Sequence, residues 1–122
     1  TTAYPIYYPG EITLIKAECY ARQGTPDLVN ALVELNKVVT KKAADDALGI
    51  GADLPLLVGP FTQAQILDQI YRNRSIELYM SGLKLDDMRR FGRVTSERTR
   101  NFMPYPFRER DNNPNTPPDP AG

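Results

Sequence analysis

The sequence predicts a mainly α-helical fold of one domain, followed by an extended, ordered C-terminal coil. Apolar residues recur at the three- and four-residue spacing of amphipathic helices between residues 10 and 92. No stretch alternates apolar and polar residues over more than a few positions, so no long strand is expected. Six of the 11 prolines follow residue 100, where they oppose regular structure. The 122 residues suffice for one small core.

Residues 8–48 are expected to form a helical hairpin. Gly24 is a plausible stop for the first helix. The second helix is expected to start with Thr25 as N-cap, Pro26 at its first position and Asp27 at the positive end of its dipole. So short a turn between antiparallel helices is typical of a tetratricopeptide-like hairpin, which needs neighbours because one hairpin cannot bury both its faces. The apolar stripes are Ile12, Ile15 and Cys19, then Leu14, Ala17 and Ala21, and in the second helix Leu28, Leu32, Leu35 and Val39, widened by Ala31 and Val38.

Residues 62–92 are expected to form a long helix followed by a short helix or turn. Thr62 is a suitable N-cap, and Gln65 stands at the capping-box position. Gly82 interrupts the pattern, which ends at Gly92. An apolar loop, 52–61, precedes this segment, and 93–122 is the proline-rich coil.

Composition excludes several classes of function. The 15 basic and 15 acidic residues balance, whereas a nucleic-acid binder normally carries a basic excess. Histidine is absent, which removes histidine-based catalytic triads and histidine metal ligands. The single cysteine allows no intrachain disulfide. No apolar run approaches the length of a membrane span, and the first residues lack a signal-peptide pattern.

The stretch "IYRNRSIELYMSGLKLDDMRRFGR" places many charges inside an apolar helical frame. Arg74 and Glu77 are i, i+3 neighbours that can pair. Asp86, Asp87, Arg89 and Arg90 form a second set. The functional interpretation is a pair of catalytic carboxylates or an anion site. We favour a salt-bridge network that fixes the helix junction, because adjacent carboxylates diverge on a helix surface.

The tyrosines Tyr4, Tyr7 and Tyr8 allow two interpretations. They either anchor the chain entry to the core or, less often, contact a ligand. Cys19 lies on an apolar stripe and is expected to be a small buried residue. No catalytic residue, metal ligand or cofactor is predicted, and no ligand-binding residue is assigned.

The C-terminal stretch "RERDNNPNTPPDPAG" allows three interpretations: a disordered tail, a calcium loop or an ordered coil. Asp111, Asn113 and Asn115 have the spacing of an EF-hand start, but Thr116 and Gly122 stand where glycine and glutamate are required. We favour an ordered coil held against the helices, in which Asp111, Asn112, Asn113 and Asn115 satisfy backbone groups.

The stretch 70–93, followed by "NFMPYPFRERDNNPNTPPDP", resembles the C-terminal end of the SusD/RagB family of outer-membrane nutrient-binding lipoproteins of Bacteroidetes. The segment 7–42 resembles the family's tetratricopeptide-type helix pair, so the resemblance covers nearly the whole chain. Two positions depart from the family pattern: Ser81, where an acidic residue is common, and Leu85, where an aromatic residue is common.

The resemblance implies a function without catalysis. It implies binding of a glycan or another nutrient at the cell surface, together with a TonB-dependent transporter, and attachment to the membrane only through a lipid anchor outside this chain. It also implies that the chain is the C-terminal portion of a longer protein and supplies scaffold helices. The alternative is a tetratricopeptide-like adaptor that binds a protein partner.

Overall fold

The computed structural model describes residues 6–97 and 105–118. These residues contain helices and no strand, which confirms the mainly α-helical fold. The chain divides into two compact units, Thr1–Phe91 and Gly92–Gly122. The four longer helices, α1 to α4, all belong to the first unit.

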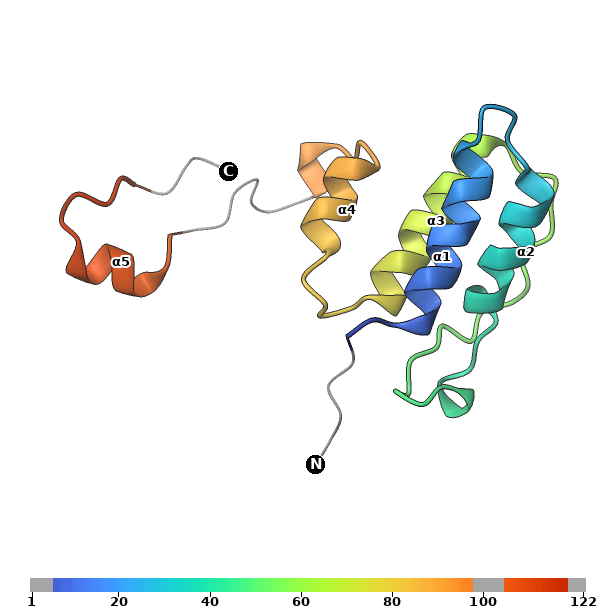
Figure 1. Ribbon diagram of the computed structural model, residues 1–122, viewed down its shortest axis with the longest axis horizontal. Coiled ribbons are helices and arrows are strands. Elements are labelled where there is room, and N and C mark those ends of the chain that lie inside the picture. The colour runs from blue at the N-terminus through green and yellow to red at the C-terminus, as the bar shows by residue number, and fades with distance from the viewer. Residues whose placement is uncertain (1–5, 98–104, 119–122) are drawn as a thin grey trace. The chain divides into compact units, whose positions relative to one another are not determined.

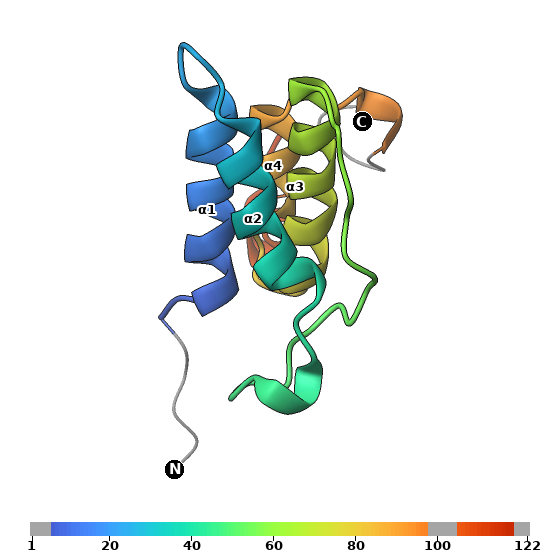
Figure 2. The same ribbon diagram turned by 90° about the vertical axis from the view of Figure 1, so that its right-hand side faces the viewer.

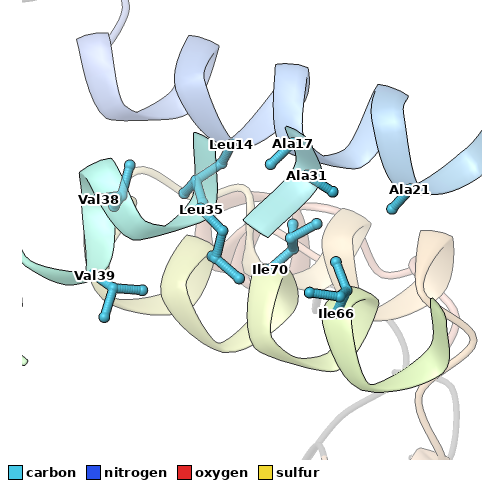
Figure 3. Packing of buried hydrophobic residues seen from close by; sticks show 9 residues of the cluster. All are labelled: Leu14, Ala17, Ala21, Ala31, Leu35, Val38, Val39, Ile66 and Ile70. Carbon is cyan, nitrogen blue, oxygen red and sulfur yellow. The ribbon is translucent and has the colours of Figure 1, made fainter. Parts of the chain in front are cut away.

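The first unit is built on three helices that lie side by side (Figures 1 and 2). They are α1 (Pro9–Arg22), α2 (Leu28–Val39) and α3 (Gln63–Glu77). Helices α1 and α2 form the expected antiparallel hairpin, and α3 packs against both. Figure 3 shows the core between them: Leu14, Ala17 and Ala21 from α1, Ala31, Leu35, Val38 and Val39 from α2, and Ile66 and Ile70 from α3.

Helix α1 buries only one of its two predicted apolar stripes. The stripe of Leu14, Ala17 and Ala21 is fully buried, because two alanines let α1 approach its neighbours closely. The other stripe, with Ile12 and Ile15, remains exposed. Cys19 belongs to that exposed stripe, so the prediction that it is buried was wrong.

Helix α2 starts later and ends earlier than the sequence suggested. Asp27, and not Thr25, is the N-cap, because its carboxylate accepts a hydrogen bond from the Asn30 amide at 3.0 Å. Thr40 is the C-cap, and only a single 3₁₀ turn, η1 (Ala43–Asp45), follows. The hairpin therefore does not extend to residue 48.

The apolar loop before α3 is tied to α2 by one side chain. Asn36 accepts a hydrogen bond from the Leu57 amide at 2.9 Å and donates one to the Leu57 carbonyl at 3.0 Å. Helix α3 then begins at the predicted capping box of Thr62 and Gln65, which is confirmed.

A tight turn joins α3 to α4 (Lys84–Arg90). Met80, with φ of 65°, and Gly82, with φ of 84°, both adopt the left-handed backbone conformation. Such a conformation favours glycine and is strained for methionine. The turn brings α4 back beside the C-terminal half of α3, where Asp87 meets Arg74.

The second unit contains a 3₁₀ turn, η2 (Thr95–Glu97), and a short helix, α5 (Phe107–Asn112), within the segment expected to be coil. The helix-compatible run 107–112 lies between Pro106 and Pro114, and proline disfavours helix at the residue before it. Two of the four side chains predicted to bond backbone groups, Asn112 and Asn113, do so around α5. Asn112 donates to the Arg108 carbonyl, and Asn113 accepts from the Asn115 amide. Packing of this segment against the helices stays a prediction.

Gly10 should be intolerant of any side chain. A Cβ atom at this position would lie 1.9 Å from Oε1 of Glu77, a side chain buried beneath α1. Glycine-to-alanine changes inside a helix normally stabilise it. We nevertheless expect Gly10→Ala to lower the free energy of unfolding by about 1–3 kcal/mol, because the buried carboxylate must shift. Urea denaturation measures this change. Gly24→Ala is the control, since a Cβ there meets nothing within 4 Å, and equal stability of both variants would contradict the prediction.

Candidate functional site

The buried face of α3 is unusually polar. Beside Ile66 and Ile70 it buries Asn73, Arg74 and Glu77, each at most 5% exposed. Buried charges cost free energy unless they are paired and hydrogen-bonded. The partners of these residues therefore define the candidate site.

Arg74 begins a chain of ion pairs that links α3, α4 and α1. Its Nε donates to Oδ2 of Asp87 at 2.8 Å, and Nη2 of Arg90 donates to Oδ1 of the same carboxylate at 2.9 Å. Arg90 also donates to Glu18 of α1, which receives a further bond from Arg22 at 2.7 Å. The hydrogen bond to Glu18 is the main reason why the pKa of Arg90 is raised.

An aromatic pair covers this chain of ion pairs. The rings of Tyr71 and Phe91 lie 5.5 Å apart between centroids. The guanidinium groups of Arg22 and Arg90 lie 5.2 and 4.6 Å from the centre of the Phe91 ring. Such cation–π contacts hold the arginines in place while their donors face the carboxylates.

A second ion cluster lies one turn further along α3, at its last residue, Glu77. Lys41 donates to the buried carboxylate of Glu77 and, at 3.0 Å, to Asp46. Burial alone would lower the pKa of Lys41, but the hydrogen bonds to Glu77 and Asp46 outweigh it and raise the pKa above 10.5. Burial alone would likewise raise the pKa of Asp46. The bond from Lys41 and those from the Ile50 and Leu48 amides instead lower it below 3.8.

The structure corrects one predicted pair and confirms the nature of the network. Arg74 pairs with Asp87, and Glu77 pairs with Lys41, so these two helix neighbours do not form the pair that their spacing suggested. The second set forms as two pairs: Asp87 with Arg90, and the exposed Asp86 with Arg89 at 3.8 Å. The favoured interpretation, a salt-bridge network at the helix junction, is the observed arrangement.

The three buried carboxylates of the network are all paired with cations. Glu18, Glu77 and Asp87 each accept a hydrogen bond from an arginine or a lysine. This arrangement differs from a glycosidase site, in which one carboxyl group donates a proton to the substrate. Among the described residues, no cluster of three acidic or cysteine side chains could hold a metal ion.

Of the three tyrosines near the start of the chain, Tyr7 and Tyr8 are among the described residues. Tyr7 is 63% exposed and Tyr8 is partly buried, whereas Tyr4 lies outside the described residues. Neither the anchoring interpretation nor the ligand interpretation is decided by these positions. Of the EF-hand candidates, Asp111 belongs to no cluster of three acidic or cysteine side chains within the described part of the second unit, and Gly122 lies outside it.

Two of the apolar hollows in the first unit lie beside the turn after α3 and beside α2, and sequence reasoning missed both. One, which we call the turn pocket, has a volume of about 370 Å³ and lies between α3, the tight turn and α4. It is lined by Arg74, Ser75, Leu78, Tyr79, Met80, Gly82, Lys84 and Asp87. The other, the α2 groove, has a volume of about 340 Å³ and lies between α2 and the loop that Asn36 holds. The one sequence signal for the turn pocket was Gly82, which interrupts an otherwise helical pattern.

Comparison with protein families assigns the chain. The model of the SusD family (SusD_RagB) matches residues 1–118. The chain belongs to the SusD family. No curated protein and no solved structure matches it significantly. Membership in the SusD family implies nutrient binding, in general of glycans, by proteins that are typically associated with the outer membrane and not known as catalysts. Among the described residues, no helix is long and apolar enough to cross a membrane.

Asp87 should be essential for stability, whereas its neighbour Asp86 should not. Removing the charge of Asp87 leaves the buried Arg74 with only the more distant carboxylate of Glu11, at 3.9 Å, so we expect Asp87→Asn to lower the free energy of unfolding by about 3–5 kcal/mol. Asp86→Asn alters an exposed pair and should change it by less than about 1 kcal/mol. Chemical denaturation of both variants measures the difference. A similar loss in both would contradict the proposed role of Asp87.

Asp46 should make stability depend on pH in acid. Because its folded pKa lies below 3.8, its contribution is present above that value and is lost as the pH falls through the folded pKa. Asp46→Asn should therefore be less stable than the natural chain at pH 7, and the difference should shrink below about pH 4. Urea melts at several pH values measure this, and a difference that stays constant down to pH 2 would contradict it.

Proposed function

We propose that this chain is the C-terminal portion of a longer protein that binds a glycan or another nutrient at the outer membrane and acts with a TonB-dependent transporter. The match to the SusD family over residues 1–118 is the observation that carries this proposal. The complete protein would be attached to the cell surface by a lipid anchor outside this chain. Cys19 does not suit the anchor, because it lies in the middle of α1.

The role of this chain within that protein would be to supply scaffold helices. Its buried charges are engaged in contacts between helices, as in the bonds from Arg74 to Asp87 and from Lys41 to Glu77. Such contacts fix how elements meet and leave ligand binding to surfaces elsewhere. This fits a function in which the protein binds a nutrient and transfers it unchanged.

The alternative is a tetratricopeptide-like adaptor that binds a protein partner. The α2 groove favours it, because Val29 and Val33 line the groove and are 75% and 51% exposed. Exposed apolar side chains around a groove are typical of protein interaction sites. The two proposals differ in the partner that the complete protein retains.

Purification of the complete natural protein from its own membranes tests the proposal. We expect an outer-membrane TonB-dependent transporter to co-purify with it, and we expect the protein to bind one class of polysaccharide on a glycan array without shortening it. A water-soluble protein partner together with no glycan binding would favour the adaptor. Release of sugar products during incubation would contradict a binding function without catalysis.

A further inference from the structure

The turn pocket combines an apolar wall with an excess of positive charge. Three of the side chains that line it are charged: Arg74, Lys84 and Asp87. Both oxygens of Asp87 are already used, Oδ2 by Arg74 and Oδ1 by Arg90. The single negative charge at the pocket is therefore fully engaged by two arginines.

Lys84 is the cation of this pocket that has no carboxylate partner among the described residues. Its ammonium donates to Oγ of Ser75 at 2.6 Å and lies 4.0 Å from the centre of the Tyr71 ring. An ammonium has three donor hydrogens, so these two contacts leave capacity for an acceptor. Lys84 is also exposed, so an acceptor can reach it from the solvent.

Arg74 lies at the floor of the pocket but offers a ligand no contact. Its Nη1 is buried and has no hydrogen-bond partner among the described residues. Its charge is balanced by Asp87 at 2.8 Å and by Glu11 at 3.9 Å. Lys84 is therefore the cation of the pocket that a ligand can reach.

The outer edge of the pocket is apolar and aromatic. Tyr79 and Met80 line it and are 77% and 86% exposed. Met80 is held in the left-handed backbone conformation, with φ of 65°, although it is not a glycine. Strained backbone of this kind is found where a fold presents side chains to a ligand. An exposed tyrosine ring offers a flat face with a polar hydroxyl at one end, which suits a sugar ring.

We propose that the turn pocket binds an acidic sugar of the uronate class, with its carboxylate on the ammonium of Lys84 and its ring on Tyr79. This inference rests on the proposed function, because it takes the ligand to be a glycan, and it deepens that function by naming a class of ligand. A neutral sugar would leave the charge of Lys84 without a counter-ion.

Calorimetric titration of the 122-residue chain with tri-galacturonate tests the proposal. Neutral galactotriose is the matched ligand. We expect saturable binding of the acidic trisaccharide only, and we expect it to weaken as salt is added, because an exposed ion pair is screened. Absence of binding, or equal binding of both trisaccharides, would overturn the proposal.

Two substitutions of equal charge change locate the site. Lys84→Gln should weaken binding of tri-galacturonate roughly tenfold or more, since a charge-assisted hydrogen bond is lost. Lys42→Gln removes the same charge from an exposed lysine that does not line the pocket, and it should leave the affinity unchanged. An equal loss of affinity in the two variants would mean that binding depends only on net charge, and it would overturn the assignment of Lys84 to the site.

Lys84 also contacts Ser75 and Tyr71, so Lys84→Gln could weaken binding by disturbing the fold. A third variant separates these two effects. Tyr79→Ala alters a side chain that is largely exposed and should weaken binding while the thermal melt stays unchanged. Unaltered affinity in this variant would overturn the placement of the sugar ring. Failure of these titrations leaves the proposed function standing, because the test of that function uses the complete protein and its transporter.

Discussion

The carboxylate of Asp87 is the group on which the arrangement of α1, α3 and α4 depends. Apolar packing does little to fix α4, since Met88 is the one apolar residue that this seven-residue helix buries among its described positions. Asp87 instead receives Arg74 from α3 and Arg90 from its own helix, and Arg90 continues to Glu18 of α1. Hydrogen-bond geometry is directional, whereas apolar contact is not. The polar network therefore specifies an orientation that a small apolar contact could not.

The sequence was most informative where structure is local. The capping box of Thr62 and Gln65 and the buried face of α2 depend on residues within a few positions, and both were predicted. The partner of Arg74 was not, because Asp87 lies 13 residues further on and meets it only through a turn with two left-handed residues. For a similar reason, the sequence did not show which of the two apolar stripes of α1 is buried. Its two stripes are equally apolar, and only the packing of α2 and α3 selects the alanine stripe.

The candidate binding surface was harder to predict than the core. In a helical reading, Tyr79 and Met80 continue the apolar pattern of α3 and look like core residues. In the structure α3 ends at Glu77, and both side chains are exposed at the turn. The side chains are exposed because Met80 adopts a left-handed backbone conformation, which a methionine rarely adopts and which the sequence therefore did not indicate. Family membership, in contrast, was evident from sequence, because it depends on the order of residues and not on their contacts.

Asp87 links the scaffold to the candidate site because both of its carboxylate oxygens already accept hydrogen bonds from arginines. Oδ2 of Asp87 accepts from Arg74 of α3, and Oδ1 accepts from Arg90 of α4. Because both oxygens are engaged, Asp87 cannot also neutralise Lys84 across the turn pocket. Lys84 is therefore left beside the aromatic edge of the turn pocket without a carboxylate partner among the described residues. A lone ammonium beside an exposed aromatic ring is suited to holding an anionic ligand.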